Sequence, residues 1–332
     1  MPKMQNLFSP VHRQKMKLRM ALTGVSGGGK TLGALYIAYG ITHDWDKIAL
    51  IDTEHERGRA YAGRTDLPTE TGAYLYTALY APYSPERYKE CVRQGAEAVG
   101  PDGVVIVDSL THAWNNEGGV LEIKEQIAGR PGKNSYTAWN EAGKEQNSLI
   151  NYILSVNCHT IVTMRSKMEY ALQLNERGKQ EPVKLGLAPV QRDDTEYEFD
   201  IVMNIGRDHV ATTSKDVTFL DGFGAVITPE LGAQLHAWLA EGKEPERYYC
   251  ADCSARIEDS SKGPAVKRVA ATTEHFGRAL CESCTKLALR AEKAAQEAAG
   301  NGWKPARATA AACQSARLCA RQRPNIAPNR TA

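Results

Sequence analysis

The sequence lacks the features of a membrane or disulfide-rich secreted protein. No apolar run approaches the about 20 residues that a membrane-spanning helix needs, and residues 1–17 are basic without the apolar segment of a secretory signal. Eight cysteines among 332 residues are too few and too unevenly spaced for a disulfide scaffold. We therefore expect a globular cytoplasmic protein with no membrane partner, long enough for one large domain and a smaller module.

Acidic residues become scarce toward the C-terminal end. Residues 243–332 hold 16 Lys/Arg and 9 Asp/Glu, whereas residues 1–242 hold 25 and 30, so the net charge of +2 hides two opposite regions. The last part, residues 301–332, is rich in Ala, Arg, Pro and Asn and contains no acid. A basic appendage on an acidic body favours a polyanionic partner such as nucleic acid, and a solvated tail is the alternative.

Short apolar runs alternate with helical patterns through most of the chain. The patterns predict strands at 17–23, 47–53, 74–79, 103–108, 158–163, 197–205 and 209–213, and helices at 31–41, 84–99, 135–155 and 229–240. This alternation predicts an α/β fold with a mainly parallel central sheet flanked by helices. Residues 165–192 mix cations with acids, and the turn signal at 175–178 favours a hairpin there.

A glycine-rich segment between the first strand and the first helix matches GxxxxGK[ST] at every defined position. Glycines let backbone N–H groups curl around a phosphate, and the helix N-terminus adds partial positive charge. The lysine is expected to bridge the β- and γ-phosphates of ATP, and the threonine to ligate Mg²⁺. The predicted cofactors are therefore ATP and Mg²⁺, held by Gly24, Val25, Ser26, Gly27, Gly28, Gly29, Lys30 and Thr31.

Two further acids follow buried strands. Asp108 ends the most apolar run of the chain, where a carboxylate can hold the Mg²⁺ shell. Asp52 and Glu54 end the strand after the first helix, and a carboxylate there could polarise the attacking water. The residues alone leave open whether either of the latter two is only an exposed loop acid.

Several segments resemble one family of ATPases. Residues 51–55 with Tyr61-Ala62 resemble the part of RecA that carries its catalytic glutamate, and residues 105–109 resemble its Walker B strand. Residues 163–167 and 186–200 resemble in particular the RecA-like, AAA-family ATPases of phages and prophages, some of which are Sak-type single-strand annealing recombinases. The resemblance covers residues 17–240.

The resemblance implies roles for single residues. Glu54 would orient the hydrolytic water, and Arg165 or Lys167 would sense the γ-phosphate and signal to the basic loop at 165–192. RecA has an amide side chain near this position, where this chain has Met164-Arg165. Arg192 could reach the ATP of a neighbouring subunit, or it could be a solvated arginine.

Two CxxC pairs stand after the main domain, separated by 27 residues. Such knuckles can place four thiolates around a structural Zn²⁺, and we expect an extended hairpin between them. Tyr248, Tyr249 and Phe276 could supply a small core, and His275 is an alternative ligand. The predicted zinc ligands are Cys250, Cys253, Cys281 and Cys284.

The expected organisation is an N-terminal arm (1–16), a RecA-like ATPase domain (17–242), a zinc-ribbon-like module with a helix (243–299) and a basic disordered tail (300–332). The first functional hypothesis is an ATPase that binds single-stranded DNA as a ring or filament and works with phage replication or recombination proteins. The second is an ATP-driven assembly switch that captures a protein partner through the zinc module. The third is a small-molecule kinase of P-loop type, which the glutamate position argues against.

Overall fold

The chain forms two compact units, Met1–Glu244 and Pro245–Ala332, in the computed structural model. The structure describes residues 11–174, 180–244, 248–253, 256–258, 260 and 263–300. The predicted tail at 301–332 and the predicted turn at 175–178 lie outside or largely outside these ranges. None of the described helices is long and apolar enough to cross a bilayer.

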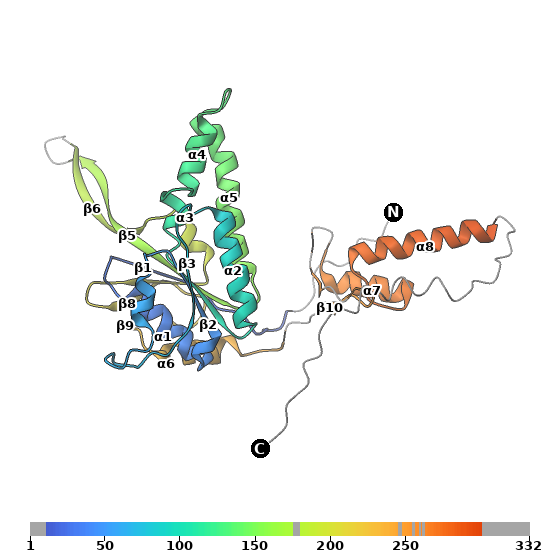
Figure 1. Cartoon of the computed structure of the whole chain (residues 1–332), viewed down its shortest axis with the longest axis horizontal. Helices are drawn as coiled ribbons and strands as arrows, with labels where there is room; N and C mark the ends of the chain where they lie inside the picture. Colours follow the sequence, from blue (N-terminus) through green and yellow to red (C-terminus); the bar gives the residue numbers. More distant parts are fainter. Residues whose placement is uncertain are drawn as a thin grey trace, which may run out of the picture. The chain divides into compact units, whose positions relative to one another are not determined.

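A nine-stranded sheet forms the centre of the first unit (Figure 1). Its main order is β3-β2-β4-β5-β1-β7-β8-β9, and β6 pairs with β5. The strands from β3 to β7 in this order are parallel, and β8, β9 and β6 pair antiparallel, so the predicted mainly parallel α/β fold is confirmed. The strands are β1 (Arg19–Gly24), β2 (Ile48–Asp52), β3 (Leu75–Ala78), β4 (Val104–Asp108), β5 (His159–Leu174), β6 (Gln180–Pro189), β7 (Ile201–Ile205), β8 (Val210–Lys215) and β9 (Gly224–Val226).

Strand β5 belongs to the central sheet in its first part and to a hairpin with β6 in its second part. Its first part lies between β4 and β1, and from Ser166 onward it pairs antiparallel with β6. The resulting β5–β6 hairpin projects away from the sheet in Figure 1. The hairpin predicted between residues 165 and 192 is therefore present, and it continues directly from a central strand.

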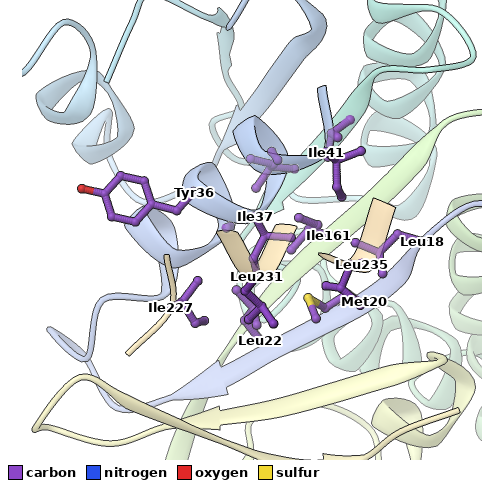
Figure 2. Close-up of a cluster of buried hydrophobic side chains, with 14 of the residues drawn as sticks. Leu18, Met20, Leu22, Tyr36, Ile37, Ile41, Ile161, Ile227, Leu231 and Leu235 are labelled. Atoms are coloured by element: carbon purple, nitrogen blue, oxygen red, sulfur yellow. The ribbon is translucent and has the colours of Figure 1, made fainter. Parts of the chain in front are cut away.

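Helices cover both faces of the sheet because alternate residues of its buried strands point to opposite sides. Met20 and Leu22 of β1 pack with α1 and α6 on one face (Figure 2), and Ala21 packs with α2 and α5 on the other. The helices are α1 (Lys30–Thr42), α2 (Pro85–Val99), α3 (His112–Asn115), α4 (Val120–Ala128), α5 (Ser135–Ser155) and α6 (Pro229–Leu239). Both apolar clusters include residues of β1 and β4, so these two strands are packed on both faces.

Some local predictions differ from the structure. The strand expected at 197–205 begins only at Ile201, because Thr195–Glu198 forms a 3₁₀ turn. Ser84 precedes α2 but makes no side-chain cap, so Pro85 at the first turn is the remaining start signal. Helices α3 and α4 and strand β9 were not predicted.

The second unit contains two short strands and two helices: β10 (Tyr248–Tyr249), β11 (Arg256–Ile257), α7 (Ala265–Phe276) and α8 (Glu282–Gly300). The extended hairpin expected between the CxxC pairs is wrong, because the 12-residue helix α7 lies within that interval. Tyr248 and Phe276 pack on the small core as predicted, whereas Tyr249 is exposed.

Candidate functional site

The sheet order gathers polar residues at the carboxyl ends of its central strands. Parallel strands end at the same edge, which is where α/β proteins bind ligands. Gly24 at the end of β1 is level with Arg165 on β5, and Asp52 at the end of β2 is level with Asp108 on β4. Residues that are far apart in the sequence therefore meet at one edge.

The phosphate loop is folded as its glycines require. Gly27 and Gly29 have φ angles of 80° and 98°, which disfavour residues with a Cβ. Lys30 Nζ donates hydrogen bonds to the carbonyl oxygens of Gly24 (3.0 Å) and Val25 (2.9 Å). Burial lowers the pKa of Lys30, and nearby Asp108 opposes that shift. The ammonium group thus lies inside the loop, in position for an anion.

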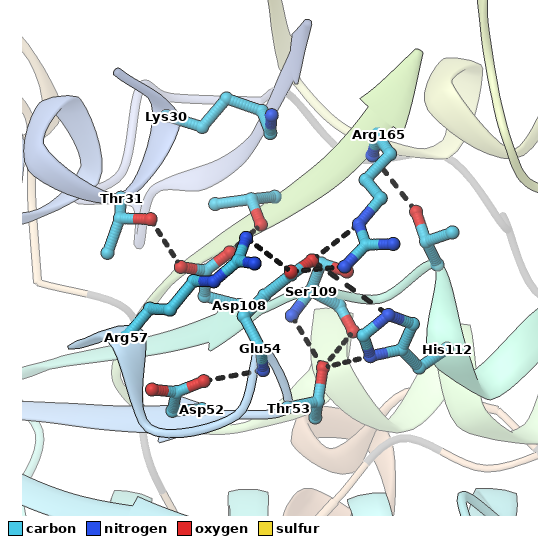
Figure 3. Close-up of polar contacts among 12 residues, drawn as sticks. Lys30, Thr31, Asp52, Thr53, Glu54, Arg57, Asp108, Ser109, His112 and Arg165 are labelled. Atoms are coloured by element: carbon cyan, nitrogen blue, oxygen red, sulfur yellow. Dashed lines mark hydrogen bonds and ion pairs between the residues drawn. The ribbon is translucent and has the colours of Figure 1, made fainter. Parts of the chain in front are cut away.

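Thr31 and Asp108, the two predicted magnesium residues, are in direct contact. Thr31 Oγ1 donates to Asp108 Oδ2 at 2.5 Å, and Thr163 on β5 donates to the other carboxylate oxygen (Figure 3). Complete burial raises the pKa of Asp108, while the two threonine hydrogen bonds act to lower it. A hydroxyl and a carboxylate beside the phosphate loop fit the oxygen ligands that Mg²⁺ prefers.

Glu54 and Arg165 form a two-pronged ion pair. Arg165 Nε donates to Glu54 Oε1 at 2.7 Å, and an Nη atom donates to Oε2 (Figure 3). Burial would raise the pKa of Glu54, but the hydrogen bonds and charge of Arg165 outweigh it, so this pKa is lowered. The same hydrogen bonds raise the pKa of Arg165. Glu54 is therefore a carboxylate held at a defined place near Lys30.

His112 and Arg57 also approach Glu54 and were missed in the sequence. His112 Nε2 lies 3.9 Å from Glu54 Oε1, and its Nδ1 lies 2.8 Å from Thr53 Oγ1. Burial lowers the pKa of His112, so we expect a neutral ring that holds Thr53 and Glu54 in place. Arg57 Nη1 lies 3.9 Å from Glu54. Only the position of His112 four residues after the Asp108 strand end could have indicated it.

The carboxylate of Asp52 is used to hold the loop after β2 and does not line the pocket. Its carboxylate accepts the backbone N–H groups of Glu54 (2.5 Å) and Gly58 (2.7 Å) and the hydroxyl of Tyr76 (3.1 Å). The side chain is 1% exposed. Of the two acids considered for polarising water, Asp52 shapes the loop and Glu54 faces the pocket.

A pocket of about 620 Å³ joins these residues. Lys30, Thr31, Glu54, Asp108 and Arg165 all line it, together with Ser26 to Gly29 of the phosphate loop. Beyond the loop its walls are more apolar and include Tyr36, Tyr61, Pro68, Val226 and Ile227. The volume and the change from polar to apolar walls suit a phosphorylated ligand with a flat aromatic group.

Two cations proposed from the sequence lie elsewhere. Lys167 is exposed and does not line this pocket, so Arg165 is the residue of that pair that reaches it. Arg192 Nη1 donates to Asn147 on α5 at 2.9 Å. Its role toward a neighbouring subunit stays a prediction.

The four cysteines of the second unit form one cluster. Their sulfur atoms lie within 4.8 Å of one another, and Cys253 Sγ is 3.7 Å from Cys281 Sγ. Tetrahedral thiolates about 2.3 Å from zinc would lie roughly 3.8 Å apart, so the cluster is compatible with a structural zinc. His275 is outside it and contacts Glu292 at 3.0 Å.

A family model described as "AAA domain" matches residues 16–225. A search of curated proteins found no match. The matched range contains the phosphate loop, the Asp108 strand end and the Glu54–Arg165 pair. The chain belongs to the AAA domain family of P-loop, nucleotide-binding ATPases.

Proposed function

We propose that this protein hydrolyses Mg-ATP to ADP and phosphate and uses the cycle to act on single-stranded DNA, as the RecA-like phage ATPases and Sak-type recombinases that its sequence resembles do. The observation that carries this proposal is the position of Arg165. It pairs with Glu54 in the nucleotide pocket and stands one residue before the β5–β6 hairpin.

The hydrolytic step follows from the pocket geometry. Backbone N–H groups of the phosphate loop and Lys30 would bind the phosphates, and Thr31 and Asp108 would hold Mg²⁺. Magnesium supplies charge neutralisation at the γ-phosphate when bound. Glu54 would accept the proton of a water whose oxygen attacks γ-phosphorus, while the bond to the ADP oxygen breaks.

Arg165 would link the pocket to the hairpin. Its guanidinium is 40% exposed and lines the same pocket as Lys30. A γ-phosphate offers a second anion of the kind that a guanidinium binds in two-pronged fashion. A guanidinium shared between Glu54 and a phosphate would move the start of the hairpin with the state of the nucleotide.

The DNA-binding part of the proposal rests on the hairpin sequence and on charge. Residues 165–192 hold Arg165, Lys167, Arg177, Lys179, Lys184 and Arg192. Contacts to the phosphate backbone would dominate, since Tyr170 is the single aromatic residue in this segment. We expect ATP turnover to rise with single-stranded DNA and to fall steeply with salt. Equal rates with single-stranded DNA, duplex DNA and no DNA would contradict this function.

Glu54→Gln tests the hydrolytic role separately. The amide keeps the size of the side chain but cannot take the proton, so turnover should fall about 10²- to 10⁴-fold while ATP still binds. Glu56→Gln is the matched control, because Glu56 pairs with Arg59, three residues later, and does not line the pocket. Unchanged turnover in Glu54→Gln would refute the base assignment.

The second unit supports one competing function. Four clustered thiols would fold a zinc module with no open coordination position, which suits docking rather than chemistry. In an ATP-driven assembly switch this module would capture a protein partner. Deleting residues 243–332 would then abolish partner capture and leave DNA binding intact, whereas a module that grips DNA would lose DNA affinity.

A further inference from the structure

The loop between α4 and α5 is the most exposed part of the helices that follow β4. Residues 129–136 are eight consecutive exposed positions. They include Arg130, Lys133 and Tyr136 and contain no carboxylate. We call this loop with the first turn of α5 the arm tip (residues 129–139).

Aromatic side chains gather at the arm tip. Tyr136 is 81% exposed and Trp139, three residues later on the same helical face, is 37% exposed. The Trp139 ring stacks on Trp114 at 5.8 Å between centroids, and Lys124 Nζ lies 5.6 Å from its centre. Trp139 is thus held by its contact with Trp114, whereas the ring of Tyr136 is exposed to solvent. Tyrosine and tryptophan are enriched at binding surfaces, because each joins a large apolar ring to a polar group.

The cations of the arm tip differ in how they are used. Lys133 pairs with Glu141 on α5. Arg130 makes no ion pair with any residue in the described ranges. The guanidinium of Arg130, in the same exposed loop as Tyr136, is therefore available for an external anion.

The arm tip lies at the nucleotide-binding edge of the sheet. Helix α5 leads back into the start of β5, so it runs opposite to the parallel strands, and its N-terminus lies toward their carboxyl ends. Figure 1 shows α4, α5 and the β5–β6 hairpin projecting on the same side of the sheet. Single-stranded DNA bound by the β5–β6 hairpin would therefore lie at the same edge of the sheet as the arm tip.

We propose that the arm tip is a second contact for single-stranded DNA, in which a base stacks on Tyr136 and Arg130 binds a flanking phosphate. This inference rests on the proposed function and extends its DNA surface beyond the hairpin. A tyrosine ring and a guanidinium match the two chemical features that every nucleotide of a single strand repeats, a flat base and an anion. A protein partner would have to bring an acidic side chain to match Arg130, whereas each nucleotide of a single strand supplies both a flat base and an anion.

The test measures binding of fluorescein-labelled oligo(dT) to the full-length protein with Mg-ATP. Tyr136→Ala should weaken binding about 5- to 150-fold, the range for loss of one stacked base, and Tyr136→Phe should restore it because the ring is kept. Tyr197→Ala is the matched control, since Tyr197 is 60% exposed on another element of the same unit. Arg130→Gln should reduce the slope of log affinity against log salt by about 0.7, as expected for one phosphate contact with a single strand.

The outcomes separate this inference from the proposed function. Wild-type binding with equal affinities for Tyr136→Ala and Tyr197→Ala would overturn the arm-tip contact and leave the hairpin function standing. No oligo(dT) binding by the wild type would refute both. If Tyr136→Ala changed the molecular mass in sedimentation but not the DNA affinity, the arm tip would be a surface for self-association and the inference would be wrong.

Discussion

The two units of this protein reach a folded state by different means. The first buries two extensive apolar clusters on opposite faces of its sheet, with large side chains such as Tyr88 and Phe199 fully enclosed. Among the described residues of the second unit, four are buried in its core: Cys250, Ile257, Ala265 and Leu280. A core this small contributes little hydrophobic free energy, so we expect the second unit to need a metal bound by its thiols in order to fold. The first unit can instead keep its polar groups for a ligand.

Removal of the metal should produce the largest difference between the two units, because it should unfold the second and leave the first folded. Chelation of zinc, or Cys281→Ser, should unfold α7 and α8, because structural zinc contributes roughly 10–16 kcal/mol of apparent binding free energy in small modules. Circular dichroism and limited proteolysis would show the loss, while ATP affinity of the first unit stays unchanged. Cys91→Ser is the control, since Cys91 lies half-buried on α2. Unfolding of the first unit would show that the units are not independent.

Lys30→Ala should produce the opposite pattern, loss of chemistry without loss of fold. Removing the cation inside the phosphate loop should lower turnover roughly 10³-fold. Melting temperature and zinc content should hardly change, because Lys30 bonds only to two loop carbonyl groups and not to the core. Retained ATP turnover would contradict the assignment of the pocket as the nucleotide site.

Leu235→Ala tests the claim that the first unit is held by apolar packing. Leu235 on α6 is fully buried against α1 and the sheet (Figure 2). Its truncation should lower the free energy of unfolding by about 3 kcal/mol, measured by urea denaturation. Leu289→Ala on α8 is the control, as Leu289 is 48% exposed. Zinc content should be the same in both variants.

Sequence reasoning located the parts of the site that depend on local order. The glycines, Lys30 and Thr31 are fixed by their spacing between a strand and a helix, and Asp108 by the end of an apolar run. Contacts that depend on strand order were not predictable. The Glu54–Arg165 pair joins residues 111 positions apart, and it requires β4 to lie between β2, which ends just before Glu54, and β5, which carries Arg165.

The extended hairpin predicted in the second unit was wrong because a helical pattern in the sequence was overlooked. Ala265, Val269, Thr272 and Phe276 recur at helical spacing and face the small core. The CxxC spacing alone led to the prediction of a hairpin. The three- to four-residue spacing of these side chains favours a helix, and the structure has helix α7 there. His112 was missed for a different reason, because its contacts with Thr53 and Glu54 come from another strand.

The smallest expected effect is a loss of folding stability in acid, caused by one buried histidine at the amino end of the first unit's sheet. His159 is 4% exposed, and its Nδ1 accepts a hydrogen bond from the Leu18 N–H at 3.0 Å. Burial, with the nearby cation Lys17 acting the same way, lowers the pKa of His159 to about 3. Below the unfolded value of about 6.5 the unfolded chain binds a proton that the folded chain does not, so stability should fall by up to about 1.4 kcal/mol per pH unit.

This loss should begin as the pH falls below about 6.5 and continue toward the folded pKa of about 3. His159→Asn offers an amide oxygen to the Leu18 N–H without a titrating ring, so the free energy of unfolding should depend less on pH across this range. His43→Asn is the control, because His43 is exposed and has a φ of 50°, which asparagine adopts readily. Urea unfolding at pH 5 and pH 7 measures the difference. An equal pH dependence in wild type and His159→Asn would mean that the first unit's acid sensitivity does not come from His159 but from other groups, such as Glu54, whose pKa is lowered in the folded state.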